Sequence, residues 1–245
     1  MNGEAGSMAA VANALAGMPM IWLLVTVGAF QIGVRLNQAC RGCAIVNPVL
    51  IAMTAVIALL LALGVDYASY LANGGSLVAA VLGPATVALA VPLYGNARRI
   101  GRAMAPLACA VLVGGIVAAA TAFALAWLLG APEAVLRSIA VKSVTAPIAI
   151  GVAEQIGGIA SLAAAFAVLT GVAGCILSPW LLHRIGVTSP ESVGLATGVT
   201  SHGQGTARML SMDETAGAFA SVGMGANALA TAIWLPLVIA MAGLG

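Results

Sequence analysis

Long intervals without a single charged residue are the feature that most restricts how this chain can fold. Residues 42–65, 67–97, 103–132 and 155–183 contain no Asp, Glu, Lys or Arg, and no charge follows Glu214. A helix needs about 20 mainly apolar residues to cross a hydrocarbon core of about 30 Å, and each interval provides enough. Only 7% of the 245 residues are charged, whereas soluble domains carry about 25%. The chain is therefore expected to be an all-α integral membrane protein embedded in a lipid bilayer.

The apolar stretches predict seven or eight membrane elements within one transmembrane domain, residues 18–245, after an N-terminal extension, residues 1–17. The expected elements are residues 20–36, 48–63, 76–94, 105–129, a broken element at 132–155, 159–182, a polar broken element at 190–212, and 216–242. The start of the chain has no Lys or Arg before Arg35, which favours a retained first span over a cleavable signal peptide.

Arginines gather in alternate loops, near residues 35–41 and 98–102. Basic loops usually face the cytoplasm, which places the N-terminus outside. The side on which His183 and Arg184 lie depends on residues 132–155. If that segment crosses the membrane they are external, and if it turns back as a re-entrant hairpin they are cytoplasmic. The sequence leaves both possibilities open.

Three apolar segments are interrupted by helix breakers, and such interruptions must face protein or a water-filled cavity because lipid cannot satisfy free backbone groups. In the first, residues 82–96, Pro84 and Thr86 follow a glycine. A proline in the first turn of a half-helix leaves N–H groups free for a carboxylate, although a simple proline kink is an equal alternative. Residues 86–91 and 145–150 share the pattern T-x-x-[LI]-A-[VI], a weak indication of duplicated halves.

The second segment places an ammonium group, two hydroxyls and a chain break within six residues. These are Lys142, Ser143, Thr145 and Pro147. A deeply placed ionisable residue in a membrane is usually functional, and here an anion site is expected. Alternatively, Lys142 reaches the interface beside Arg137. Glu154, further along, either pairs with Lys142, carries a coupling proton, or is a solvated helix end.

The third segment is the most polar part of the chain, and its candidate site residues are Ser201, His202, Gly205, Thr206 and Arg208. Arginine binds carboxylates through two parallel hydrogen bonds, and histidine titrates near neutral pH, which suits proton coupling. The alternative is a glycine-rich re-entrant loop in which Arg208 pairs with Asp213 or Glu214.

Several other functions are excluded or disfavoured. No Gly-Lys-Ser or Gly-Lys-Thr makes a phosphate-binding loop, and Ser201 lacks the strand-turn-helix context of a hydrolase nucleophile. The net charge of +2 is too small for a nucleic-acid footprint. Cys40 and Cys43 form a lone C-x-x-C without a second pair or histidines, which is more typical of a structural role than of a metal or redox site. We expect no enzyme activity and no cofactor.

Five segments in order resemble the LrgB/CidB family, bacterial antiholin-like membrane proteins related to the plastidic glycolate/glycerate translocator. The segments read NPVL at 47–50, LGPATVALAVPLY at 82–94, KSVTAPIA at 142–149, EQIGG at 154–158 and SHGQGTAR at 201–208. The resemblance implies a bacterial inner-membrane protein with an inverted-repeat fold akin to cation:proton antiporters, usually partnered by a small LrgA/CidA-like subunit. A homo-oligomer is also expected.

The residues and the family resemblance together lead to two expected functions. In the first, the chain is a secondary transporter of small monocarboxylates, with a proton carried by Glu154 or His202; the resemblance implies glycolate, glycerate or pyruvate as substrates. The substrate would be bound by the polar residues and prolines of the three interruptions: Pro84, Thr86, Lys142, Ser143, Thr145, Pro147, Ser201, His202, Gly205, Thr206 and Arg208. In the second, the chain is an antiholin-like regulator of murein hydrolase export and cell lysis that acts by membrane assembly.

Overall fold

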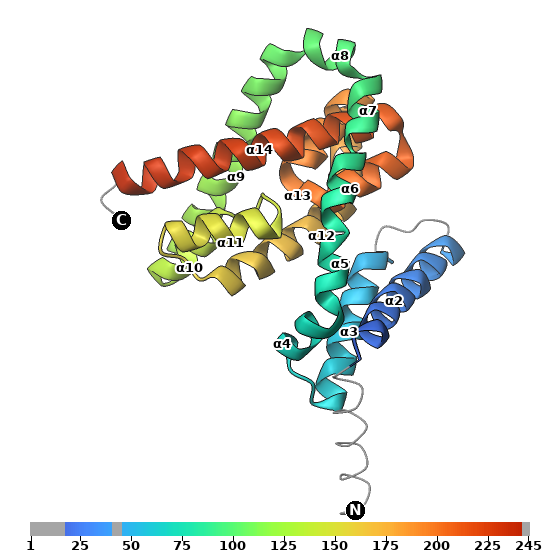
Figure 1. Cartoon of the computed structure of the whole chain (residues 1–245). Coiled ribbons are helices and arrows are strands. Elements are labelled where there is room, and N and C mark those ends of the chain that lie inside the picture. The colour runs from blue at the N-terminus through green and yellow to red at the C-terminus, as the bar shows by residue number, and fades with distance from the viewer. Residues whose placement is uncertain (1–17, 41–45, 242–245) are drawn as a thin grey trace, which may run out of the picture. The chain divides into compact units, whose positions relative to one another are not determined.

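A computed structural model describes residues 18–40 and 46–241, which consist of helices and connecting turns without any strand (Figure 1). This confirms the all-α class. The predicted extension at residues 1–17 and Cys43 lie outside the described residues. By its internal contacts the chain divides into two units, Met1–Ala88 and Leu89–Gly245.

Within residues 18–40 and 46–241, five helical runs are long and apolar enough to cross a membrane: Met20–Ala39, Tyr67–Gly95, Met104–Leu128, Ala160–Arg184 and Glu214–Met241. A shorter apolar helix covers Pro48–Leu63. These helices make the chain a multi-pass membrane protein. The total of seven or eight membrane elements and the inverted repeat stay predictions.

In the first unit, α2 (Pro19–Ala39) and α3 (Pro48–Leu63) form an antiparallel pair. Near the end of α2, Gly33 lies directly against the backbone of Pro48, the first residue of α3. Near the start of α2, the buried Trp22 packs with Val56 and Leu60 of α3. Helix α3 starts where it does because the Asn47 side chain accepts hydrogen bonds from the backbone N–H groups of residues 49 and 50.

Four short segments complete this unit: α4 (Tyr67–Tyr70), a π-helical turn at Leu71–Gly75, α5 (Ser76–Ala80) and α6 (Leu82–Ala88). The Tyr70 ring meets Trp22 edge-on at 5.8 Å between centroids, and its hydroxyl lies 3.0 Å from the Thr26 hydroxyl. The backbone N–H of Ser69, which donates to Asp66, is the main cause of a lowered pKa of that exposed carboxyl.

The second unit contains the remaining helices: α7 (Ala90–Gly95), α8 (Ala97–Arg102), α9 (Met104–Leu128), α10 (Glu133–Ala140), α11 (Ala146–Gln155), α12 (Ala160–Arg184), α13 (Pro190–Met212) and α14 (Glu214–Met241). Helices α9, α12 and α14 are long enough to cross a bilayer. Helices α10 and α11 have 8 and 10 residues and are too short to do so.

The segment containing α10, the turn 141–145 and α11, which we call hairpin A, returns to the point where it begins (yellow in Figure 1). The Ser138 hydroxyl accepts a hydrogen bond of 2.7 Å from the Ile159 backbone N–H. One residue earlier, Arg137 donates to the Ile156 carbonyl oxygen at 2.9 Å. A crossing would separate the two ends by about 30 Å, so the contacts favour a hairpin that turns back over a segment that crosses. The side on which His183 and Arg184 lie stays a prediction.

Helix α13 is also a re-entrant hairpin, which we call hairpin B, because its backbone reverses at His202 (φ 38°, ψ −125°). A Cβ placed on Gly205 would lie only 2.8 Å from the Thr197 carbonyl oxygen. Eight residues of straight α-helix would separate these positions by about 12 Å. The two arms of the hairpin, residues 190–201 and 203–212, therefore lie side by side.

The contacts of hairpin B with α14 confirm the reversal. Gly194 and Gly198 of the first arm lie against the backbone of Ala216 and Ala220, so this arm runs in the same direction as α14. In the second arm, Leu210 contacts Gly217 while the earlier residue Thr206 reaches the later Met224. That arm therefore runs opposite to α14.

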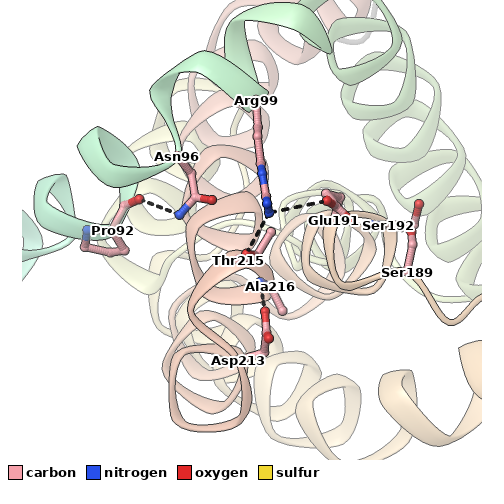
Figure 2. Close-up of polar contacts among 9 residues, drawn as sticks. All are labelled: Pro92, Asn96, Arg99, Ser189, Glu191, Ser192, Asp213, Thr215 and Ala216. Carbon is pink, nitrogen blue, oxygen red and sulfur yellow. Dashed lines mark hydrogen bonds and ion pairs between the residues drawn. The ribbon is translucent and has the colours of Figure 1, made fainter.

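Both ends of hairpin B lie beside Arg99 of α8, as Figure 2 shows. The Arg99 guanidinium lies 3.9 Å from the Glu191 carboxylate at the start of α13. The same Nη1 donates to the Thr215 hydroxyl of α14 at 3.3 Å. Because Thr215 follows the end of α13 by three residues, the segment enters and leaves on one side.

The two hairpins enter from opposite sides if α9, α12 and α14 each cross the membrane. Hairpin A lies between the end of α9 and the start of α12, whereas hairpin B lies between the end of α12 and the start of α14. Arg184, at the end of α12, then falls on the same side as the arginines of α8. Under the positive-inside rule this side is cytoplasmic.

Candidate functional site

The tip of hairpin A carries the cation predicted from sequence. The Lys142 ammonium donates to the Ser143 hydroxyl at 3.1 Å, and Ser143 is buried whereas Lys142 is half-buried. Thr145 is the residue immediately before α11, and its side chain does not cap the helix. Pro147 lies in the first turn and is exposed. The tip therefore combines an ammonium, a hydroxyl and the positive end of a ten-residue helix, which all favour an anion.

The tip of hairpin B is formed by Ser201 and His202, which are both buried. The imidazole lies against Gly171 of α12, and its Nε2 lies 2.9 Å from the Ala167 carbonyl oxygen. Because a carbonyl oxygen only accepts, Nε2 must carry the hydrogen, which leaves Nδ1 as the position for a second proton. The Ser201 hydroxyl lies 3.2 Å from that of Thr200.

Asn227, which the sequence analysis did not select, joins the two tips. Its side-chain amide donates to the Ser143 carbonyl oxygen at 2.9 Å and to the Val199 carbonyl oxygen at 3.3 Å. The residue is only 1% exposed. It lies 13 positions after Glu214, the first residue of the 28-residue α14, and thus near its middle. The junction of the tips is therefore about 20 Å along a helix that is long enough to span the membrane.

Lys142 also lies close enough to His202 for the two charges to interact electrostatically. Residues 142 and 202 belong to different hairpins, and the fold brings them to the same region. Of the predicted site residues, the structure thus groups Lys142, Ser143, Ser201 and His202 around the tips.

Other predicted residues lie further away or in other surroundings. Gly205 packs between the arms of hairpin B, against Thr197, and supports the reversal of the chain. Thr206 is buried, and its hydroxyl donates to the Met224 sulfur at 3.8 Å. Arg208 lies six residues beyond His202, about 9 Å along the second arm. The structure records no contact between Arg208 and Lys142 among the residues it describes.

Arg208 does not form the ion pair that was the alternative prediction. Within the described ranges, no carboxylate is within ion-pair distance of Arg208, and its Nε is buried without a hydrogen-bond partner. Asp213 instead caps α14, where its carboxylate accepts from the Ala216 N–H at 2.8 Å (Figure 2). Arg208 therefore retains the capacity to bind an anion.

Glu154 does not pair with Lys142 in the part of the chain that the structure describes. It is exposed near the end of α11, away from the tip. Arg137 is a cation beside this end; it pairs with Glu133 and donates a hydrogen bond to the Ile156 carbonyl oxygen. The prediction that Lys142 pairs with Glu154 is therefore wrong. The role of Glu154 as a proton carrier stays a prediction.

Pro84 and Thr86 lie in the seven-residue α6 of the first unit. Pro84 is in the first turn, as predicted, but the Ala85 N–H bonds the Val81 carbonyl at 3.0 Å, so α6 follows α5 with little interruption. Thr86 lies inside its helix, whereas Thr145 precedes one. The two six-residue stretches of the proposed duplication thus differ in local structure.

A family model described as LrgB-like matches residues 26–241. The chain is 31% identical over 220 residues to "Holin-like protein CidB" of Staphylococcus epidermidis (strain ATCC 12228 / FDA PCI 1200), with 90% of this chain and 95% of that protein covered. It is 32% identical to "Holin-like protein CidB" of Staphylococcus aureus (strain N315) and 34% identical to YxaC of Bacillus subtilis (strain 168), with the same coverage in each case. No solved structure matches.

Proposed function

This chain belongs to the LrgB-like family, and with that premise we propose that it is a secondary transporter of small monocarboxylates rather than an enzyme. One observation carries the proposal. Lys142 lies at the tip of hairpin A, next to Ser143, which is bonded to the middle of the long apolar helix α14, and within the described residues no carboxylate pairs with Lys142. An ionised group in a membrane interior is costly unless something compensates it. A small organic anion supplies that compensation.

The arrangement of the hairpins supports transport rather than simple binding. The tips meet near the middle of α14. If α9, α12 and α14 each cross the membrane, the hairpins enter from opposite sides, and movement of either one would open the junction to one side only. Irregular backbone at such a depth is typical of transporter binding sites. In this proposal Lys142 and Ser143 bind the carboxylate, with Arg208 as a second cation.

The finer features of the proposal concern the coupling ion, substrate and partner. In this proposal His202 Nδ1 accepts the coupling proton, because Nε2 already carries a hydrogen that it donates to the Ala167 carbonyl oxygen. Glycolate, glycerate, pyruvate and similar 2-hydroxy or 2-keto acids are the proposed substrates. We place the protein in the bacterial inner membrane, as a homo-oligomer that acts with a small LrgA/CidA-like subunit.

A second candidate is an antiholin-like regulator of cell lysis that acts by membrane assembly. The observation that favours it is that relatives named "Holin-like protein CidB" match this chain over 95% of their own length. In that function the hairpin tips would be packing surfaces, and no anion would need to bind.

Uptake into proteoliposomes separates the two functions. Purified protein, with and without its small partner, should accumulate labelled glycolate, glycerate or pyruvate, and Lys142→Ala should abolish uptake while the protein still inserts. If none of the three anions moves or binds, transport is rejected. If Lys142→Ala instead prevents assembly, the packing function is favoured.

A further inference from the structure

We propose that Asn227 is the positioning residue that couples the two hairpins, so that release of one tip loosens the other. Its amide nitrogen has two hydrogens, and each is donated to a different hairpin: one to Ser143 in hairpin A and one to Val199 in hairpin B. One side chain of a spanning helix thus holds two segments that are 56 positions apart in the chain, 199 minus 143.

Both acceptors are carbonyl oxygens at places where helical hydrogen bonding is interrupted. Ser143 lies in the turn between α10 and α11, and Val199 lies three residues before the reversal at His202. Backbone carbonyls near a helix end need other donors, and unpaired polar groups are especially costly in a membrane. Asn227 supplies these donors, so the hydrogen bond to the carbonyl oxygen at each hairpin tip depends on Asn227.

The orientation of the Asn227 amide is fixed by its surroundings. A rotation of the amide by 180° would point Oδ1 at two carbonyl oxygens and lose both bonds. In the observed orientation Oδ1 is buried against Gly115 of α9 and has no hydrogen-bond partner. A Cβ at Gly115 would overlap Oδ1, whereas a Cβ at the neighbouring Gly114 would lie 3.5 Å from Val199 Cγ1, an ordinary contact.

The same contacts link Asn227 to the anion site. Ser143 accepts from Asn227 through its backbone and from Lys142 through its side chain, so Asn227 fixes the residue that positions the Lys142 ammonium. The effect of Asn227 on transport rests on the proposed function. Its effect on the hairpins does not, and can be measured without any substrate.

Thiol labelling tests the coupling in detergent-purified, full-length protein with the native cysteines replaced by serine. Val144→Cys reports on the tip of hairpin A and Val199→Cys on hairpin B, since both valines are buried, 1% and 4% exposed. Val111→Cys, at a third buried valine on α9, reports on general loosening. Each is treated with a charged methanethiosulfonate reagent, alone and combined with Asn227→Asp, Gly115→Ala or the matched control Gly114→Ala.

Asn227→Asp removes at least one donor without changing the shape, and Gly115→Ala displaces the amide. Either should raise the labelling rate at both Val144→Cys and Val199→Cys at least about tenfold, while Gly114→Ala changes it less than about twofold. The proposal is overturned if only one hairpin responds, if neither does, if Gly114→Ala has the same effect, or if Val111→Cys becomes equally reactive.

Anion uptake by the same variants gives a second readout. A positioning role predicts a higher KM with a smaller change in the maximal rate, because Lys142 is retained but held less well. If the unsubstituted protein takes up no anion, the proposed function fails, yet the labelling rates still decide whether Asn227 couples the hairpins.

Discussion

His202 has an unusual backbone for a residue with a side chain. It is the one non-glycine residue with a positive φ in the described parts of the chain. Such conformations cost about 1–3 kcal/mol and persist only where the surroundings enforce them. At this position the bond to Ala167 and the following arm hold the chain in place. A glycine would adopt the turn more easily, so the imidazole is present despite its cost, which is consistent with a functional role.

Two substitutions separate the backbone and side-chain effects at position 202. His202→Ala loses the bond to Ala167 and keeps the strained backbone, whereas His202→Gly loses the bond and relieves the strain. We therefore expect His202→Gly to be the more stable variant, by about 1 kcal/mol. Thermal unfolding in detergent measures the difference, and an equal or lower stability of His202→Gly would show that the reversal is not strained.

At the scale of single residues, the sequence identified the groups at the hairpin tips but not the residue between them. Lys142 and His202 stood out because charged and titratable groups are rare in apolar segments. Asn227 was missed because a single amide in an apolar helix matches no motif. Its two acceptors are set only by the tertiary structure. A polar residue near the middle of a predicted span is the signal that would have found it.

The helical elements of the second unit pack through small residues. The first arm of hairpin B approaches α14 so closely that a Cβ at Gly198 would overlap the Ala220 carbonyl oxygen. Gly151 of α11, by contrast, has open space around its Cβ position. Close packing of small residues is a common means of helix association in membranes.

Alanine substitution should therefore have opposite effects at these two glycines. Gly198→Ala should destabilise the protein by about 1–3 kcal/mol through overpacking, while Gly151→Ala should be neutral or stabilise it by up to about 1 kcal/mol. Unfolding midpoints of both variants test this. A tolerated Gly198→Ala would mean that the first arm of hairpin B does not lie against α14.

The reversal of both hairpins predicts the accessibility of their ends. Ser189→Cys and Ser211→Cys flank hairpin B, and Pro132→Cys and Gln155→Cys flank hairpin A; all four positions are exposed. In oriented vesicles an impermeant thiol reagent should label the first pair from one side and the second pair from the other. Labelling of Ser189→Cys and Ser211→Cys from opposite sides would show that α13 crosses the membrane.

The sequence predicted where these elements lie along the chain, but not whether each broken element crosses the membrane or turns back. Six predicted elements match one helical segment each, with similar bounds, although α13 among them reverses at His202. Segment 76–94 instead contains three short helices and segment 132–155 contains two. Whether a broken segment crosses or returns depends on contacts such as Ser138 with Ile159, which are distant in sequence and carry no local pattern.

At the scale of the whole molecule, hairpin topology and charge distribution agree. If α9 and α12 cross the membrane and both hairpins are re-entrant, the arginines of α8 and Arg184 lie on the same side, where Arg99 contacts Glu191 at the start of α13 and Thr215 at the start of α14. On the opposite side, Arg137 is paired with Glu133. This asymmetry is the one that the positive-inside rule requires.

The central claim is that a small anion occupies the junction of the two hairpins and is bound by Lys142. Protection of Val144→Cys from thiol labelling tests it directly, with glycolate, glycerate and pyruvate as protecting anions and chloride as the control. The account predicts that at least one organic anion slows labelling several-fold, that chloride does not, and that Lys142→Met removes the protection. Equal labelling rates with and without every anion, or protection that persists in Lys142→Met, would contradict it.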